Sequence, residues 1–214
     1  MSRRRVRASR SQQLARRRLF LEQLEDRRVL ATWTGGGDGI SWSDANNWDT
    51  FDTPDNFGEE AIFTNVDPGT INVDGGFAIN RLRFENTAGN NFTFQNGSLS
   101  VNIVEQVGSG TNTLNTLLLT GSLTGSVSSG RLDLVDPNNA FFLTGGTWTI
   151  TGGTLAGRAN NSGGSLGAGG VNIVLDGGTL ELNEDAVTTP NALGHFGYHI
   201  NNDAIALDLH LNGG

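Results

Sequence analysis

The stretch TGGTWTITGGTLAGRANNSGGSLGAGGVNIVLDGGTLELN, residues 144–183, decides the fold of this chain. Glycine pairs separate short segments in which apolar and polar residues alternate, and strand side chains point to opposite faces with a period of two. Trp148 and Ile150 therefore share one face, as do Leu180 and Leu182 further on. Each segment is too short to bury its apolar face alone, whereas stacked segments cover one another. The pattern predicts an all-β protein, a right-handed parallel β-solenoid (β-helix) with degenerate repeats.

The same alternation is found before residue 144 and again from residue 171 onward. The apolar residues predicted to face inward are Leu82, Phe84, Phe92, Phe94, Leu99, Val101, Ile103, Leu132, Leu134, Phe141 and Leu143, followed by Val171, Ile173 and Leu175. Two alternatives stay open, a hairpin at Asn96-Gly97 and a loose β-sandwich in place of the solenoid. Repeats are irregular, because Leu166-Gly167 and Leu193-Gly194 lie 27 residues apart while the glycine pairs keep no constant spacing.

Composition excludes several classes of protein. The 214 residues include 31 glycines, which indicates frequent turns rather than long helices. No apolar run approaches the ~18 residues of a membrane-spanning helix, so no transmembrane helix is predicted. The chain has no cysteine, which excludes disulfides and thiolate metal sites. No cofactor is predicted.

Charge divides the chain into two unlike parts. All fourteen basic residues are arginine, and ten of them lie within residues 1–28 against three acidic residues, which gives this segment a charge of +7. The remainder has 19 acidic residues and four arginines, a charge of -15. A body with so few scattered bases cannot neutralise several phosphates, so nucleic acid is not a predicted partner.

The arginine-rich segment, MSRRRVRASRSQQLARRRLFLEQLEDRRVLA (residues 1–31), allows several interpretations. It has the charge of a nucleic-acid arm but few aromatic residues. It has the basic start of a secretory signal, and residues 17–21 look like a twin-arginine core, but Glu22 interrupts the apolar region that either signal needs. An amphipathic helix of a folded domain is the remaining interpretation.

Residues 18–31, RLFLEQLEDRRVLA, resemble the N-terminal "LExLEDRRxLL/A" segment of many large secreted or surface proteins of planctomycete bacteria. The resemblance implies export or surface sorting, with removal near Ala31. On this basis residues 1–31 are predicted to be an N-terminal export segment, and the protein is expected outside the cell or on its surface.

Three tryptophans, Trp33, Trp42 and Trp48, follow within sixteen residues, separated by Gly, Asp and Asn. Such a cluster buries much apolar area and can close the open end of a solenoid, so residues 32–58 are predicted to be a capping segment. The alternative is a platform on which sugar rings stack, which makes these three residues the predicted ligand-binding site.

The same segment resembles the "TWxGGxG…W…A.NW" opening that precedes autotransporter-associated β-strand repeats in secreted bacterial proteins. The "GGTL" and "ALGxG" units of that family are similar to residues 152–155, 165–169, 176–180 and 191–194. The resemblance implies that residues 59–214 are solenoid repeats. Residues 209–214 end the sequence within the repeating pattern and without a polar cap, so the chain is expected either to be truncated at its C-terminus or to end unusually bare.

Possible reaction centres are weak. His195 and His199 have the spacing of a helical zinc pair, but Gly194 and Gly197 disfavour a helix and no third ligand is placed. His210 is predicted to be a solvated strand residue. The acidic loop offers carboxylate oxygens of the kind that bind Ca²⁺, but its spacing fits no known calcium loop, and turn formation explains it better. Its residues are Asp38, Asp44, Asp49, Asp52 and Asp55. No metal site is predicted.

The sequence also allows two catalytic hypotheses. The adjacent carboxylates Glu59-Glu60 and Glu184-Asp185 would point to opposite faces of a strand, so neither pair alone joins a general acid to a nucleophile. A polysaccharide lyase on a β-helix needs a basic proton acceptor, and Arg131 and Arg158 are the only such residues in the second half.

The predicted function is therefore a non-catalytic structural or adhesive solenoid at the cell surface. Its predicted partners are surface or matrix polysaccharides or other cells, and its oligomeric state is left open. The alternatives are a carbohydrate-active β-helix enzyme and a glycan-binding module that uses the tryptophans.

Overall fold

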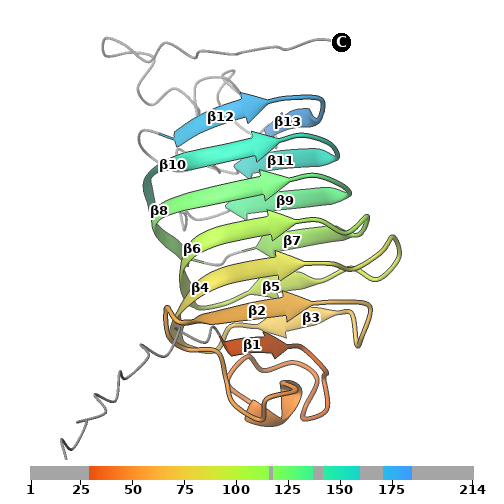
Figure 1. Cartoon of the computed structure of the whole chain (residues 1–214), viewed down its shortest axis with the longest axis vertical. Coiled ribbons are helices and arrows are strands. Elements are labelled where there is room, and N and C mark those ends of the chain that lie inside the picture. Colours follow the sequence, from red (N-terminus) through yellow and green to blue (C-terminus); the bar gives the residue numbers. More distant parts are fainter. Residues whose placement is uncertain (1–28, 116–117, 137–141, 160–170, 185–214) are drawn as a thin grey trace, which may run out of the picture.

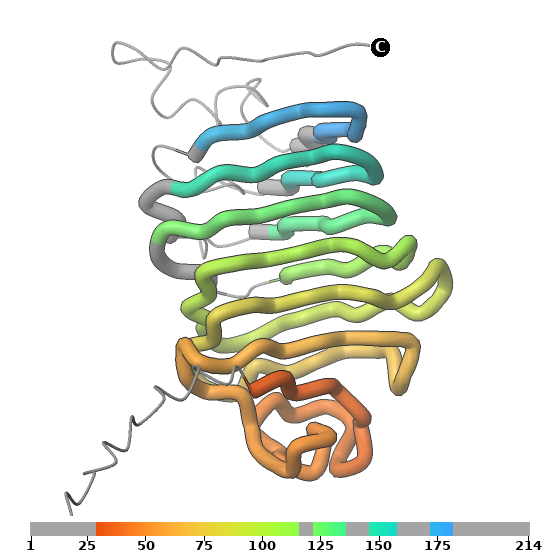
Figure 2. The backbone as a smooth tube through the Cα atoms, viewed as in Figure 1, coloured from red at the N-terminus to blue at the C-terminus, as the bar shows by residue number. Residues whose placement is uncertain are grey.

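The computed structural model describes residues 29–115, 118–136, 142–159 and 171–184. These residues form a coil of short strands that rises in successive turns (Figures 1 and 2). The first strands are β1 (Val29–Thr32), β2 (Glu59–Phe63), β3 (Thr70–Asn72), β4 (Gly76–Phe84), β5 (Thr93–Gln95), β6 (Ser98–Gln106) and β7 (Thr111–Asn115). The later strands are β8 (Leu118–Val127), β9 (Arg131–Asp136), β10 (Phe142–Ile150), β11 (Thr154–Ala159), β12 (Val171–Leu175) and β13 (Thr179–Glu184). One 3-10 helix, η1 (Ala45–Asn47), lies in the loop between β1 and β2.

The strands form two sheets that face each other. The seven-stranded sheet has the order β1-β2-β4-β6-β8-β10-β12, and the six-stranded sheet has the order β13-β11-β9-β7-β5-β3. All the pairings between these strands are parallel, and from β2 on consecutive strands alternate between the sheets. As the chain climbs, the near strands run to the right and the far strands to the left, so the coil is right-handed (Figure 1). The predicted parallel β-solenoid is confirmed, and the sandwich alternative is wrong.

Successive turns have unequal lengths. Arg81 lies above Glu60, 21 residues earlier, whereas Asn96 lies above Asn72, 24 residues earlier. The strands stay in register because the extra residues fall in the connecting loops, which tolerate insertions. The irregular spacing predicted from the sequence thus corresponds to loops of different length between strands that stay in register.

The core lies between the two sheets and is built from the predicted alternation. Of the residues predicted to face inward, Leu82, Phe84, Phe92, Phe94, Leu99, Leu132 and Leu134 are fully buried. Trp148 and Ile150 are buried too. Gly125 pairs with Trp148 in the neighbouring strand, and a Cβ on Gly125 would lie 2.0 Å from the indole ring. The glycine therefore makes room for the tryptophan, a small-to-large fit between adjacent turns.

One inward-facing prediction was wrong. Ile103 was placed in one row with Leu99 and Val101, but Val104 is buried in its stead and Ile103 is only partly covered. The register between β6 and β8 shifts between Ser100 and Ile103, which is a bulge or irregularity. Such a step reverses the alternation of side chains downstream of it.

The turn at Asn96-Gly97 is not a hairpin. It joins β5 to β6, which belong to different sheets and pair in parallel with other strands. Both residues have positive φ, 56° and 114°. A Cβ on Gly97 would lie 1.7 Å from the carbonyl oxygen of Val73 in the turn below. Glycine is required here because the backbones of stacked turns nearly touch.

The first strand begins inside the segment predicted for export. β1 pairs with β2 from Val29 onward, and Ala31 is only 2% exposed. Cleavage near Ala31, as the resemblance implied, would remove most of this strand. Several other predicted residues lie outside the part of the chain that the structure describes: Phe141, residues 165–169, Asp185, residues 191–194, His195, His199 and His210.

Candidate functional site

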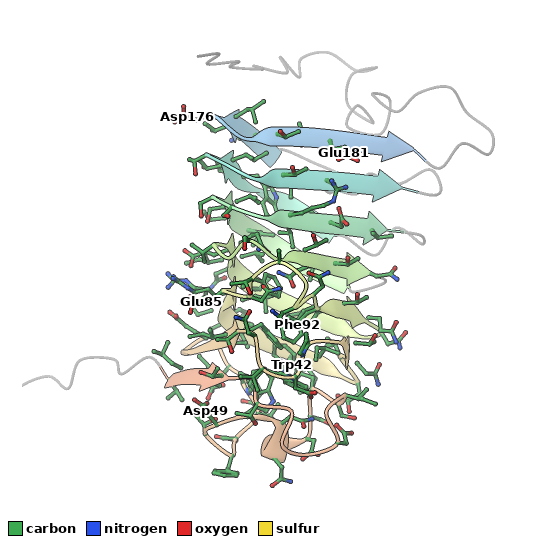
Figure 3. All side chains as sticks on the ribbon, turned by 90° about the vertical axis from the view of Figure 1, so that its right-hand side faces the viewer. Trp42, Asp49, Glu85, Phe92, Asp176 and Glu181 are labelled. Carbon is green, nitrogen blue, oxygen red and sulfur yellow. The ribbon has the colours of Figure 1, made fainter. Side chains whose placement is uncertain are left out.

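The three clustered tryptophans form the core of a cap at the first end of the coil. Residues 33–58, here called the cap loop, lie below β1 in Figure 1. Trp48 packs edge-on against Trp33 and Trp42, with ring centroids 5.2 Å and 4.8 Å apart, and all three rings surround Phe63 of β2. Figure 3 shows Trp42 and Phe92 among the side chains inside the coil. The cap loop thus extends the core beyond the first turn of the coil.

The cap loop also covers the edges of both sheets. Trp48 forms an antiparallel bridge with Trp33 just beyond β1, and the backbone N–H of Asp49 donates to Thr32 O at 3.0 Å. On the other sheet, Ser41 forms a parallel bridge with Asn72 of β3. Covered edges resist pairing with other chains, so this end of the solenoid is protected.

The predicted glycan platform is corrected by the burial of its residues. Trp33, Trp42 and Trp48 have no exposed surface, so a sugar finds no open indole face there. Trp48 Nε1 donates to Trp42 O at 2.9 Å, and Trp42 Nε1 donates to Pro54 O at 3.1 Å. These residues hold the cap loop together instead of presenting a binding surface.

Asp38 organises the polar half of the cap loop. Its Oδ1 accepts hydrogen bonds from the backbone N–H groups of Ile40 and Ser41 at 2.8 and 2.7 Å, and from Asn47 Nδ2 at 2.8 Å. Its Oδ2 accepts from Ser41 Oγ at 2.6 Å. The hydroxyl and backbone donors of Ser41, followed by the Asn47 amide, hold the pKa of Asp38 well below its ordinary value.

Acid is therefore expected to loosen the cap loop. Since the folded-state pKa of Asp38 is depressed, its contribution to stability is present above the unfolded pKa of about 3.9 and is lost as the pH falls below that value. Asp38→Asn should lower the stability at neutral pH and reduce the further loss between neutral pH and about pH 3. Tryptophan fluorescence during urea unfolding at several pH values measures both effects. Asp176→Asn, at an exposed turn far from the cap loop, is the control, and equal acid losses in wild type and Asp38→Asn would contradict the prediction.

Two more acidic residues of the cap loop have structural roles. Asp44 caps η1 and accepts from the backbone N–H groups of Asn46 and Asp38, and the Asn46 bond is the main reason its pKa is lowered. Asp49 Oδ1 accepts from the backbone N–H of Thr32 at 2.7 Å. Turn formation is thus the observed role of Asp38 and Asp44, whereas Asp49 joins the cap loop to β1. Within the described residues, no group of three or more His, Asp or Glu side chains is placed to hold a metal ion.

Glu59 and Glu60 have separate structural roles. Glu59 Oε2 accepts from the backbone N–H groups of Asp55 and Asn56, whereas Glu60 pairs with Arg81 at 3.3 Å on the outer face. Glu60 begins a ladder of ion pairs up the seven-stranded sheet, continued by Arg81–Glu105 at 3.6 Å, Arg83–Glu105 at 3.1 Å and Arg83–Glu85 at 2.6 Å. The pairs of Arg81 and Arg83 with Glu60 and Glu105 join neighbouring turns, whereas Arg83–Glu85 lies within one turn.

Arg131 joins turns on the six-stranded sheet. Its Nε lies 2.6 Å from Asp133, and its Nη1 lies 2.6 Å from Glu181 on β13, beyond the intervening strand β11. Ala156 of β11 pairs with both acidic residues and is fully buried. The hydrogen bond to Glu181 raises the pKa of the guanidinium, which opposes the proton-acceptor role considered for Arg131. The side chain of Arg158 lies outside the part of the chain that the structure describes.

Arg131→Met is expected to lower the free energy of unfolding by about 1 kcal/mol, because partly exposed ion pairs are screened by water. The double-mutant cycle with Glu181→Gln, measured by urea unfolding, isolates the interaction across β11. Methionine keeps most of the alkyl stem, so lost packing contributes little. A coupling energy of zero would show that the bridge between turns adds nothing.

Some features were not found from the sequence. Asn86, Gln106 and Asn112 form a buried cluster of amides, and the exposed rings of Phe51 and Phe57 stand out from the cap loop. The alternating pattern carries no signal for the first, since amides resemble turn residues. The second depends on how the backbone of the cap loop is anchored, which the two phenylalanines in the sequence do not indicate.

The fold and these contacts define a right-handed parallel β-solenoid with a tryptophan-rich cap. No protein-family model, curated protein or solved structure matches the chain. Among the described residues, no helix is both long and apolar enough to span a membrane.

Proposed function

We propose that the chain is a non-catalytic structural or adhesive solenoid, exported to the cell surface or the extracellular space. One observation supports this proposal most. The charged side chains that acid–base chemistry would need hold the coil together: Asp38, Asp44, Asp49 and Glu59 bind backbone N–H groups, and Arg81, Arg83 and Arg131 pair with carboxylates of other turns.

The export part of the proposal depends on the resemblance of residues 18–31 to the head of planctomycete surface proteins. β1 refines the position of cleavage. Because Val29, Leu30 and Ala31 pair with β2, we expect processing to leave these residues on the mature protein. The proposed partners are surface or matrix polysaccharides, or neighbouring cells, which would contact the long outer faces of the two sheets.

Peptide mass spectrometry of washed cells and culture medium tests the location. The expected result is a surface or secreted protein whose mature N-terminus lies at or before Val29. Intact protein in the cytosol that still begins at Met1 or Ser2 would overturn the export proposal.

A second experiment separates adhesion from catalysis. Purified protein is incubated with acidic and neutral polysaccharides, and both retention on the polymer and release of new reducing or unsaturated ends are measured. Saturable retention without new ends is expected. Depolymerisation that survives Arg131→Met would establish an enzyme with a different centre, and depolymerisation abolished by it would make Arg131 catalytic; either outcome overturns the non-catalytic proposal.

A further inference from the structure

The last ten residues before β2 form a firmly anchored part of the cap loop. Residues 49–58, DTFDTPDNFG, are here called the display loop. Trp42 Nε1 donates to Pro54 O at 3.1 Å, and Thr53 Oγ1 donates to Ser43 O at 3.1 Å. The backbone N–H groups of Asp55 and Asn56 donate to Glu59 at 2.7 and 3.1 Å. Its backbone is thus fixed to the buried tryptophan core.

The display loop nevertheless turns apolar rings outward. Phe51 is 75% exposed and Phe57 is 54% exposed, the two highest values among the large apolar side chains of the described residues. Phe51 also has a φ of +54°, a region that bulky residues rarely occupy and that costs free energy. Strain and exposure together on a rigid loop are typical of a recognition surface rather than of a core.

The display loop also carries unused charge. Asp52 and Asp55 are exposed, and within the described part of the chain their carboxylates have no hydrogen bond or ion pair. They follow Phe51 and precede Phe57. From residue 29 to residue 80 the sequence has nine acidic residues and no Arg, Lys or His. The surface therefore suits a partner that combines positive charge with apolar side chains.

Such a segment exists in the same chain and is tethered close by. Residues 1–28 have a charge of +7 and include Leu19, Phe20 and Leu21. They join the coil at Val29, which pairs with Glu59 directly after the display loop. A tether this short gives an effective concentration of about a millimolar, so weak contacts suffice for binding.

We propose that the arginine-rich head, residues 1–28, docks on the display loop of its own chain. The guanidinium groups pair with Asp52 and Asp55, and the apolar residues 19–21 and arginine faces cover the rings of Phe51 and Phe57. The docked head then shields this surface. This inference concerns the unprocessed chain and does not depend on the proposed location or on adhesion.

Trypsin tests the docking, because it cuts after the ten arginines of the head and the chain has no lysine. Cleavage of the head in the full chain is followed by mass spectrometry beside a synthetic peptide of residues 1–28. At about 0.01 M salt we expect cleavage about tenfold slower in the full chain than in the peptide, and at about 1 M salt we expect equal rates. Protection should not depend on protein concentration.

Variants locate the surface. Phe51→Ser with Phe57→Ser, and separately Asp52→Asn with Asp55→Asn, should raise the cleavage rate to that of the peptide. Val107→Ser and Val174→Ser are matched controls, since these side chains are 38% and 40% exposed away from the cap, and they should leave protection unchanged. Circular dichroism and tryptophan fluorescence verify folding. The proposal is overturned if the wild-type head is cut as fast as the peptide at low salt, or if the phenylalanine variant stays protected.

Discussion

Trp48→Ala is expected to lower the free energy of unfolding by about 3 to 5 kcal/mol, the usual cost of removing a fully buried aromatic side chain. Trp48 has no exposed surface and lies between three other rings, those of Trp33, Trp42 and Phe63 at 5.2, 4.8 and 5.7 Å. Removing it leaves a cavity at the centre of the cap. Urea unfolding followed by circular dichroism measures the loss.

Replacing a tryptophan of the cap by phenylalanine separates the effect of packing from that of hydrogen bonding. Trp48 Nε1 donates to Trp42 O, whereas Trp33 Nε1 is buried without a hydrogen-bond partner. Trp48→Phe leaves that carbonyl without its donor, and Trp33→Phe removes an unsatisfied donor. Trp48→Phe should therefore cost more than Trp33→Phe by about 1 to 2 kcal/mol. Equal costs would show that ring volume alone decides the stability of the cap.

Alternation and glycine pairs were sufficient to predict the solenoid, because every short strand has an apolar face that only a stacked neighbour can bury. Leu82 and Phe84 were placed inside from their spacing alone, and so were Leu132 and Leu134. Ile103 was misplaced because a register step changes the backbone without changing the composition of the strand. A pattern with a period of two has no means of marking such a step.

The tryptophan-rich segment was predicted only in part. Its aromatic content favoured burial, and Trp33, Trp42 and Trp48 are indeed buried. Which rings of the cap would face water could not be predicted, since this depends on hydrogen bonds between residues far apart, such as that from Trp42 to Pro54. Phe51 is exposed because the anchored backbone gives it a positive φ, which no sequence pattern indicates.

The buried amides were the other feature without a sequence signal. Asn86 comes from one turn of the coil and Gln106 and Asn112 from the next, and none of the three has exposed surface. Asn112 Oδ1 accepts from Asn86 Nδ2 and from the backbone N–H of Phe92, both at 3.0 Å. Asn112 Nδ2 donates to Asn86 Oδ1 at 2.8 Å and to Gln106 Oε1 at 2.7 Å. One side chain thus satisfies four polar partners inside the core.

Asn112→Leu is expected to cost about 3 to 5 kcal/mol, although leucine has a similar size and is more apolar. Each buried donor or acceptor left without a partner costs about 1 to 3 kcal/mol, and this variant leaves several at once. The exposed Asn102 of β6, whose amide lies 3.4 Å from Asn80, is the matched control, and Asn102→Leu should change stability by less than about 0.5 kcal/mol.

Hydrogen exchange along the chain shows which strands Asn112→Leu destabilises, and so tests whether the amide cluster is the cause. Because the amides join consecutive turns, Asn112→Leu should increase hydrogen exchange at Phe92, which donates to Asn112, and in β7, which contains Asn112, more than in β2 beside the cap. A variant as stable as the wild type would mean that the apolar gain of leucine offsets the broken network. In that case the amides would specify how the turns are stacked rather than stabilise the coil.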